Sequence, residues 1–184
     1  MLIDITVEMT TERAKEAGKN NSHLRPGHYG THFDVMNKSF PIEYAKRRGI
    51  FFDVSSVKDR DIDITDIDAS AIAADMFVGF YTGFIEEKGY GTPDYFGIHP
   101  QLSKELIELL CEKGISIIGI DFSGARNGSE HMPTDQYCAD RNVFILENIC
   151  NLKPVADKGV CVVDTFPIKY SDLTGLPCRV MVEI

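Results

Sequence analysis

Two histidines and an aspartate occupy alternate positions near the start of the chain. Residues 28–34 read HYGTHFD, which places His28, His32 and Asp34 at even positions with Gly30 between them. In an extended strand these positions share one face, whereas a helix would turn Asp34 away from His28. Neutral imidazole nitrogen and carboxylate oxygen both suit Zn²⁺ and Mn²⁺. We therefore expect His28, His32 and Asp34 to be metal ligands on one strand.

One strand cannot close a metal site, so further ligands must come from elsewhere in the chain. Glu147 follows four apolar residues, 143–146, where a buried carboxylate needs a cation, an ion pair or hydrogen bonds. The polar segment 128–137 lies shortly before it, and either His131 or Asp135 could reach the same pocket. The alternative for Asp135 is a carboxylate that only favours a helix start.

Length, charge and cysteine content limit which kinds of protein this chain can be. The chain has 184 residues, a net charge of −9 and an isoelectric point near 5.0. This length predicts a single domain, 1–184. An acidic chain without a basic stripe does not favour nucleic acid or a membrane surface as a partner.

The start of the chain does not resemble a signal peptide, so we expect a cytoplasmic protein. Five cysteines without a C-x-x-C pair indicate neither disulfides nor a thiolate zinc site.

Patterns typical of strands and helices alternate along the chain. Apolar and alternating runs predict strands at 1–6, 28–34, 50–54, 76–81, 115–120, 143–146, 160–163 and 179–184. Helical patterns occupy 10–22 (a short helix or loop), 41–48, 69–75 and 103–113, and a further helix start is expected at 133–134. Interleaved strands and helices favour the α/β class with a mixed sheet.

The segment that carries the candidate ligands also resembles a known family motif. His-x-Gly-Thr-His-x-Asp at 28–34 is similar to the signature of the cyclase-type metal-dependent hydrolases. That family includes bacterial kynurenine formamidase (arylformamidase), isatin hydrolase and a zinc-dependent dienelactone hydrolase. Weaker similarities follow in the family's order and extend the resemblance across nearly the whole chain, at 97–103, 119–123, 145–148, 167–169 and 175–179.

The resemblance implies a fold, a cofactor and a reaction class. It implies a swivelling β/β/α-type fold, an oligomer such as a dimer or tetramer, and a small-molecule substrate. The reaction would be hydrolysis of an amide, lactone or cyclic amide, with one or two Zn²⁺ or Mn²⁺ ions per chain. Carried over by position, the resemblance makes His28, His32, Asp34 and Glu147 metal ligands, with Asp34 and Glu147 able to bridge two ions.

Departures from the family pattern concern catalysis and the substrate. The family continues its motif as Asp-x-Pro-x-His, where the last histidine moves protons, but this chain has Lys38 at that position. Counting back from Glu147, the family's second-metal histidine falls on Asp135, and the nearest histidine is His131. We therefore predict Asp135 as a metal ligand, and Lys38 and His131 as catalytic residues. The N-terminal segment that holds an aromatic substrate in the family is also replaced here, by a stretch rich in Lys and Glu.

These observations predict a hydrolase whose metal-bound hydroxide attacks an amide or formamide carbonyl, as in the arylformamidases. Lys38 would protonate the leaving nitrogen or stabilise the oxyanion, and the alternative is a lysine that only faces solvent. A lactone or cyclic-amide hydrolase of the same family is a second interpretation. The departures at 38 and 135 leave open a third, a metal- or small-molecule-binding protein without catalysis.

Overall fold

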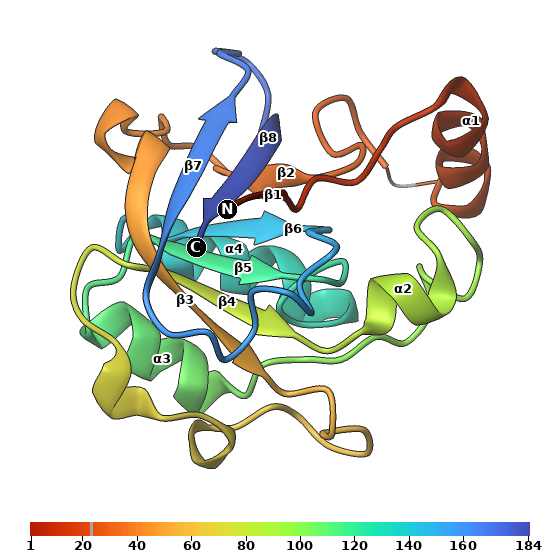
Figure 1. Cartoon of the computed structure of the whole chain (residues 1–184). Helices are drawn as coiled ribbons and strands as arrows, with labels where there is room; N and C mark the ends of the chain where they lie inside the picture. Colours follow the sequence, from red (N-terminus) through yellow and green to blue (C-terminus); the bar gives the residue numbers. More distant parts are fainter. Residues whose placement is uncertain (23) are drawn as a thin grey trace.

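The computed structural model describes residues 1–22 and 24–184. The strands are β1 (Leu2–Asp4), β2 (His32–Asp34), β3 (Lys46–Asp53), β4 (Phe77–Tyr81), β5 (Ile117–Ile120), β6 (Phe144–Glu147), β7 (Cys161–Pro167) and β8 (Gly175–Glu183). They form one sheet in the order β1-β8-β2-β6-β5-β4-β3-β7. A further pairing between β7 and β8 closes every strand except β1 into a barrel (Figure 1).

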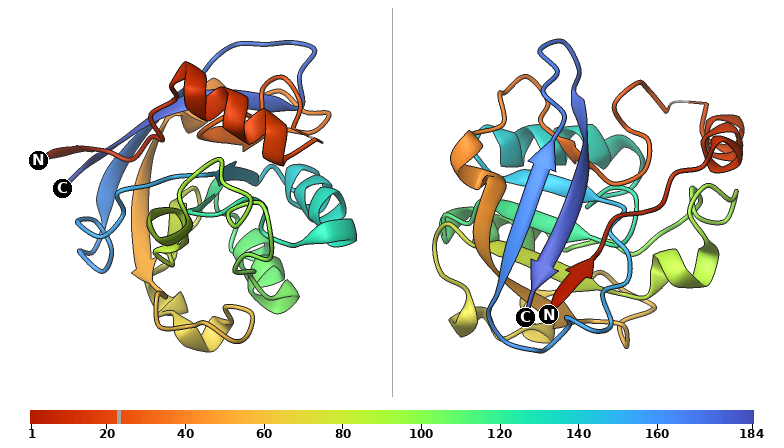
Figure 2. Two further views of the ribbon diagram at one scale, coloured as in Figure 1. Left: turned by 90° about the vertical axis from the view of Figure 1, so that its right-hand side faces the viewer. Right: turned by 45° about the horizontal axis from the view of Figure 1, so that its top comes forward.

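The sheet is mixed. β3, β4, β5 and β6 run parallel to one another in that order, and the remaining pairings are antiparallel. Parallel neighbours need crossover connections, and helices α2 (Phe84–Lys88), α3 (Lys104–Glu112) and α4 (His131–Ala139) lie on them. Figure 2 shows α3 and α4 on the side of the barrel away from the two chain termini. The predicted α/β class with a mixed sheet is confirmed.

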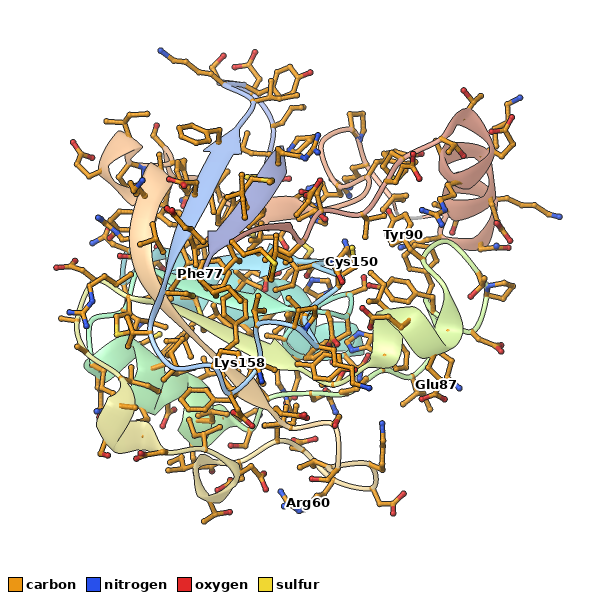
Figure 3. The ribbon with its side chains drawn as sticks, in the orientation of Figure 1. Arg60, Phe77, Glu87, Tyr90, Cys150 and Lys158 are labelled. Carbon is orange, nitrogen blue, oxygen red and sulfur yellow. The ribbon has the colours of Figure 1, made fainter. Side chains whose placement is uncertain are left out.

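Alternate residues of the parallel strands face two separate apolar clusters, because side chains alternate along a strand. Phe51 and Phe77 belong to the cluster inside the barrel, whereas their neighbours Phe52 and Val78 belong to the cluster that also contains apolar side chains of α3. In Figure 3, Phe77 lies among the strands of the barrel. The alternation explains why these strands are apolar on both faces.

Two glycines make room for the phenylalanine rings inside the barrel. A Cβ on Gly79 would lie 2.2 Å from Cδ1 of Phe51, which pairs with Gly79 across β3 and β4. A Cβ on Gly119 would lie 2.4 Å from Cζ of Phe77. Both distances are far shorter than a van der Waals contact, so any larger residue would displace a ring in a densely packed core.

Three predicted elements are shorter than the sequence suggested. The predicted strand 28–34 is reduced to β2, because Gly30 has a φ of +69° and interrupts the extended backbone. The predicted helix 41–48 contains only a 3-10 helix, Ile42–Ala45, since the next residues pair with β7 as the start of β3. The predicted helix 69–75 is the short 3-10 helix Ala69–Ala71.

Other predicted elements are confirmed. The segment 10–22 contains α1 (Thr11–Asn20), and the helix predicted at 103–113 is α3. Ser103 caps α3, because its hydroxyl accepts a hydrogen bond from Leu106 N at 3.1 Å. Within the described part of the chain, none of the helices combines the length and the apolar character needed to cross a membrane.

Candidate metal centre

The register of the sheet brings His32, Asp34 and Glu147 together. β2 and β6 are antiparallel, with His32 directly opposite Glu147, and Asp34 lies two residues further along on the face of His32. His32 Nε2 lies 3.7 Å from Glu147 Oε2 and 3.6 Å from Asp34 Oδ1. All three side chains are at least 96% buried.

His28 reaches this cluster from the turn before β2. Its Nδ1 lies 3.0 Å from Asp34 Oδ1 and 3.1 Å from His32 Nε2. With the 3.6 Å between His32 and Asp34, the three donor atoms form a triangle whose edges suit donors about 2 Å from one shared ion. The three side chains therefore converge although the strand predicted for them is interrupted, and their role as metal ligands stays a prediction.

Helix α4 contributes both residues between which the sequence could not decide. His131 and Asp135 are four residues apart and share one helix face, with His131 Nε2 3.2 Å from Asp135 Oδ2. The same Nε2 lies 3.1 Å from Glu147 Oε1. Asp34, His131 and Asp135 form a second group of candidate ligands, and the first group is His28, His32 and Asp34. Asp34 thus belongs to both groups.

Two oxygen atoms of the cluster indicate that it needs a cation. Asp34 Oδ2 and Asp135 Oδ1 are buried without a hydrogen-bond partner among the described residues. A buried acceptor left unpaired costs about 1–3 kcal/mol, and more when it is charged. Imidazole and carboxylate are also the donors that first-row divalent metals take. The residues present therefore fit a divalent metal ion.

The electrostatics of the cluster lead to the same conclusion. Burial raises the pKa of Asp135 well above its usual value, and the neighbouring Asp34 charge raises it further. Burial opposes charge on the imidazoles, but the surrounding carboxylates outweigh it and raise the pKa of His32 to about 9 and that of His131 to about 10. Without a metal, protons held by the histidines supply the positive charge that the carboxylates require.

Neighbouring groups fix how two of the imidazoles are presented. His28 Nε2 lies 2.9 Å from Thr174 Oγ1, which leaves Nδ1 to face the cluster. His32 Nδ1 donates to Gly30 O at 3.0 Å, which leaves Nε2 to face the cluster. Such outer contacts select the tautomer and hold the ring orientation of a ligating histidine.

Asn148 and two tyrosines hold the turn that carries Gly30. Asn148 Nδ2 donates to Gly30 O at 2.8 Å, and Tyr95 donates from its hydroxyl to Asn148 Oδ1 at 2.6 Å. Gly30 N donates to the hydroxyl of Tyr90 at 2.7 Å, and Figure 3 shows Tyr90 on the side of the molecule where α1 and α2 lie. None of the three was predicted as a site residue, although Tyr90 and Tyr95 lie in an aromatic loop of the kind found near ligand sites and Asn148 follows Glu147 directly.

Lys38 lies at the surface instead of in the cluster. A turn closed by a hydrogen bond from Lys38 N to Val35 O follows β2, with Met36 at a φ of +54°. Proline, which the resemblance implies at this position, cannot adopt that angle. Lys38 Nζ lies 2.7 Å from Asp140 Oδ1, and its side chain is 37% exposed. This arrangement argues against the catalytic role predicted for Lys38.

The fold and part of the sequence match known proteins. Residues 3–125 match the family model Cyclase, described as "Putative cyclase". No curated protein sequence matches the chain. A solved structure of a potential metal-dependent hydrolase with cyclase activity has a TM-score of 0.77 at 24% identity, covering 99% of this chain and 98% of its own.

Two further solved structures share the fold. A predicted metal-dependent hydrolase from Bacillus stearothermophilus has a TM-score of 0.77 at 22% identity, covering 99% of this chain and 97% of its own. Isatin hydrolase A from Labrenzia aggregata has a TM-score of 0.73 at 19% identity, covering 100% and 93%. These likenesses confirm the predicted fold of the cyclase-type proteins. The family match spans more than half of the sequence, and the chain belongs to the Cyclase family.

Proposed function

We propose that the protein is a metal-dependent hydrolase that cleaves an amide or formamide at its carbonyl carbon. The observation that carries this proposal is a pair of buried oxygens, Asp34 Oδ2 and Asp135 Oδ1, which have no hydrogen-bond partner in the described part of the chain and lie in a cluster with three imidazoles. Membership of the Cyclase family supports it, as does the shared fold of proteins described as metal-dependent hydrolases.

The candidate ligands suit two ions, since both groups include Asp34. A bound divalent metal supplies water of lowered pKa and polarises a carbonyl oxygen. His28 and His131 are the partly exposed members of the cluster, with side chains 21% and 33% exposed. Substrate therefore approaches from their side, while the buried carboxylates and His32 stay behind the reacting carbonyl.

The candidates for the acid–base partner are His131 and Lys38. His131 lies at the exposed side of the cluster, and its Nε2 is placed to exchange a proton with substrate only when it does not ligate the second ion. Because Lys38 is paired with Asp140, we expect Lys38→Ala to leave kcat within about threefold of the wild type. A hundredfold loss of kcat, which is typical when a catalytic proton donor is removed, would restore the predicted acid role of Lys38.

A cyclic amide is the second candidate substrate class. Isatin hydrolases, whose substrate contains such an amide, share the fold at TM-scores of 0.71 to 0.73. The third candidate is a protein that binds metal and small molecules without turnover. The placement of Lys38 favours it, because Lys38 pairs with Asp140 at the surface instead of facing the cluster.

The proposal is tested by hydrolysis assays on three substrates: N-formylkynurenine, isatin and a simple lactone. The protein is compared after loading with Zn²⁺ or Mn²⁺, after chelation, and as the His32→Ala variant. We expect turnover of the formamide by the loaded wild type only, restored to the chelated sample when metal is returned. Faster turnover of isatin would favour the cyclic-amide class. Bound metal without turnover of any of the three would refute the hydrolase proposal.

A further inference from the structure

The two groups of candidate ligands differ in their donor atoms. The first group consists of three donor atoms: His28 Nδ1, His32 Nε2 and Asp34 Oδ1. The second group consists of His131, Asp135 and Asp34, and Glu147 Oε1 lies 3.1 Å from His131 Nε2. Glu147 reaches both groups, because its Oε2 lies 3.7 Å from His32 Nε2. Apart from Glu147, the first group offers two imidazoles and one carboxylate, whereas the second group offers one imidazole and two carboxylates.

Of the two unsatisfied atoms, one belongs to Asp135 of the oxygen-rich group and the other to Asp34, which both groups share. Asp34 Oδ1 lies 3.0 Å from His28, which leaves Oδ2 without a partner among the described residues. Asp135 Oδ2 lies 3.2 Å from His131, which leaves Oδ1 without one. Both side chains are at least 96% buried, so bulk water does not solvate these oxygens. Buried carboxylates in this state need a cation.

We propose that the second group is a separate subsite for a hard divalent ion of the Mn²⁺ class, while the nitrogen-rich first group takes Zn²⁺. Carboxylate oxygens suit Mn²⁺ and Mg²⁺, and imidazole nitrogens suit Zn²⁺. Asp135 carries this difference, because it supplies a second carboxylate where the first group has a second imidazole. The inference rests on the metal site of the proposed function and goes further, since it assigns a metal class to each half.

The direct test uses the wild-type protein and no enzyme assay. One equivalent of Mn²⁺ is bound to the metal-free protein, one equivalent of Zn²⁺ is then added, and free Mn²⁺ is followed by electron paramagnetic resonance. We expect Mn²⁺ to stay bound while Zn²⁺ fills the first group, so that desalted protein contains one of each per chain. Release of the bound Mn²⁺ by the single equivalent of Zn²⁺ would overturn the proposal.

Two variants locate the ions. His28→Ala should lose Zn²⁺ and keep Mn²⁺, because it removes a donor of the first group only. Asp135→His should weaken Mn²⁺ binding by roughly tenfold or more and admit a second Zn²⁺. Asp140→His is the matched control. Asp140 is exposed and pairs with Lys38 at the surface, so this variant should bind metal as the wild type does. Parallel loss of both metals in His28→Ala would contradict separate subsites.

Failure of this inference can be told apart from failure of the proposed function. A wild type that binds two Zn²⁺ ions, releases Mn²⁺ and still hydrolyses substrate refutes only the assignment of metal classes. A wild type that binds neither ion refutes both. Because the wild-type measurement stands alone, a variant that does not fold leaves the test intact.

Discussion

Removal of metal from the cluster should make the stability of the protein fall as the pH rises. Burial opposes charge on His32, but Asp34 and Glu147 outweigh it and raise its pKa to about 9 in the metal-free protein. In the unfolded chain the same imidazole titrates near 6.5. The folded state therefore binds this proton more tightly. Its stabilising contribution is complete below pH 6.5 and is lost as the pH rises through 9.

The expected loss of stability follows from the rise in the pKa of His32. A rise of the pKa of His32 from 6.5 to about 9 corresponds to about 3 kcal/mol of stability. In a chain of this length 1 kcal/mol moves the Tm by about 2–4 °C, so the Tm of the metal-free protein should fall by roughly 6–12 °C between pH 6.5 and 9. A bound divalent ion needs neutral imidazoles, so metal binding is favoured over the same range.

Thermal unfolding of chelated and Mn²⁺-loaded protein from pH 6 to 9 measures this competition. The gap between the two Tm values should widen as the pH rises. In His32→Gln the pH-dependent fall of the metal-free protein should become shallower, whereas Lys38→Gln, which alters a surface ion pair, should leave it unchanged. Two curves that stay parallel across the range would refute the reasoning that protons and metal compete for the cluster.

Three further predictions concern the elements around the cluster. Gly79→Ala should lower the free energy of unfolding in urea by about 1–3 kcal/mol, because its Cβ would overlap a buried ring, whereas Gly97→Ala, whose Cβ would meet nothing closer than 3.4 Å, should cost far less. Thr174→Val should weaken metal binding by about 10–100-fold in a chelator competition, because the hydroxyl holds His28; an unchanged affinity would contradict that role. Burial raises the pKa of Asp121 to about 7, so unfolding free energy should fall as the pH rises from 4 to 7, and Asp121→Asn should make this slope shallower.

The residue types of the site could be predicted from the sequence because few alternatives exist for them. Two imidazoles and a carboxylate at positions 28, 32 and 34 make little sense as a core, and Glu147 at the end of an apolar strand must be compensated. The register of β2 and β6 then brings these side chains together, because His32 and Glu147 lie directly opposite each other.

The remaining features depend on contacts that local patterns do not contain. Thr174 contacts His28 across 146 positions of sequence, and nothing near either residue signals it. Pro41 and Gly49 are typical of helix ends, but pairing of 46–49 with β7 overrides that preference. Lys38 stands where the resemblance implies a proton-transfer histidine, yet its side chain follows the turn at Met36 and pairs with Asp140.

The metal content per chain is the most direct test of the central claim. Elemental analysis is made on wild type and on His32→Ala, and formamide hydrolysis is measured on the same samples. We expect two divalent ions per wild-type chain and active protein, and in the variant the loss of the first-group ion together with turnover. Wild-type protein that holds no divalent metal after exposure to Zn²⁺ and Mn²⁺ would contradict the account, because the buried oxygens of Asp34 and Asp135 would then have another partner.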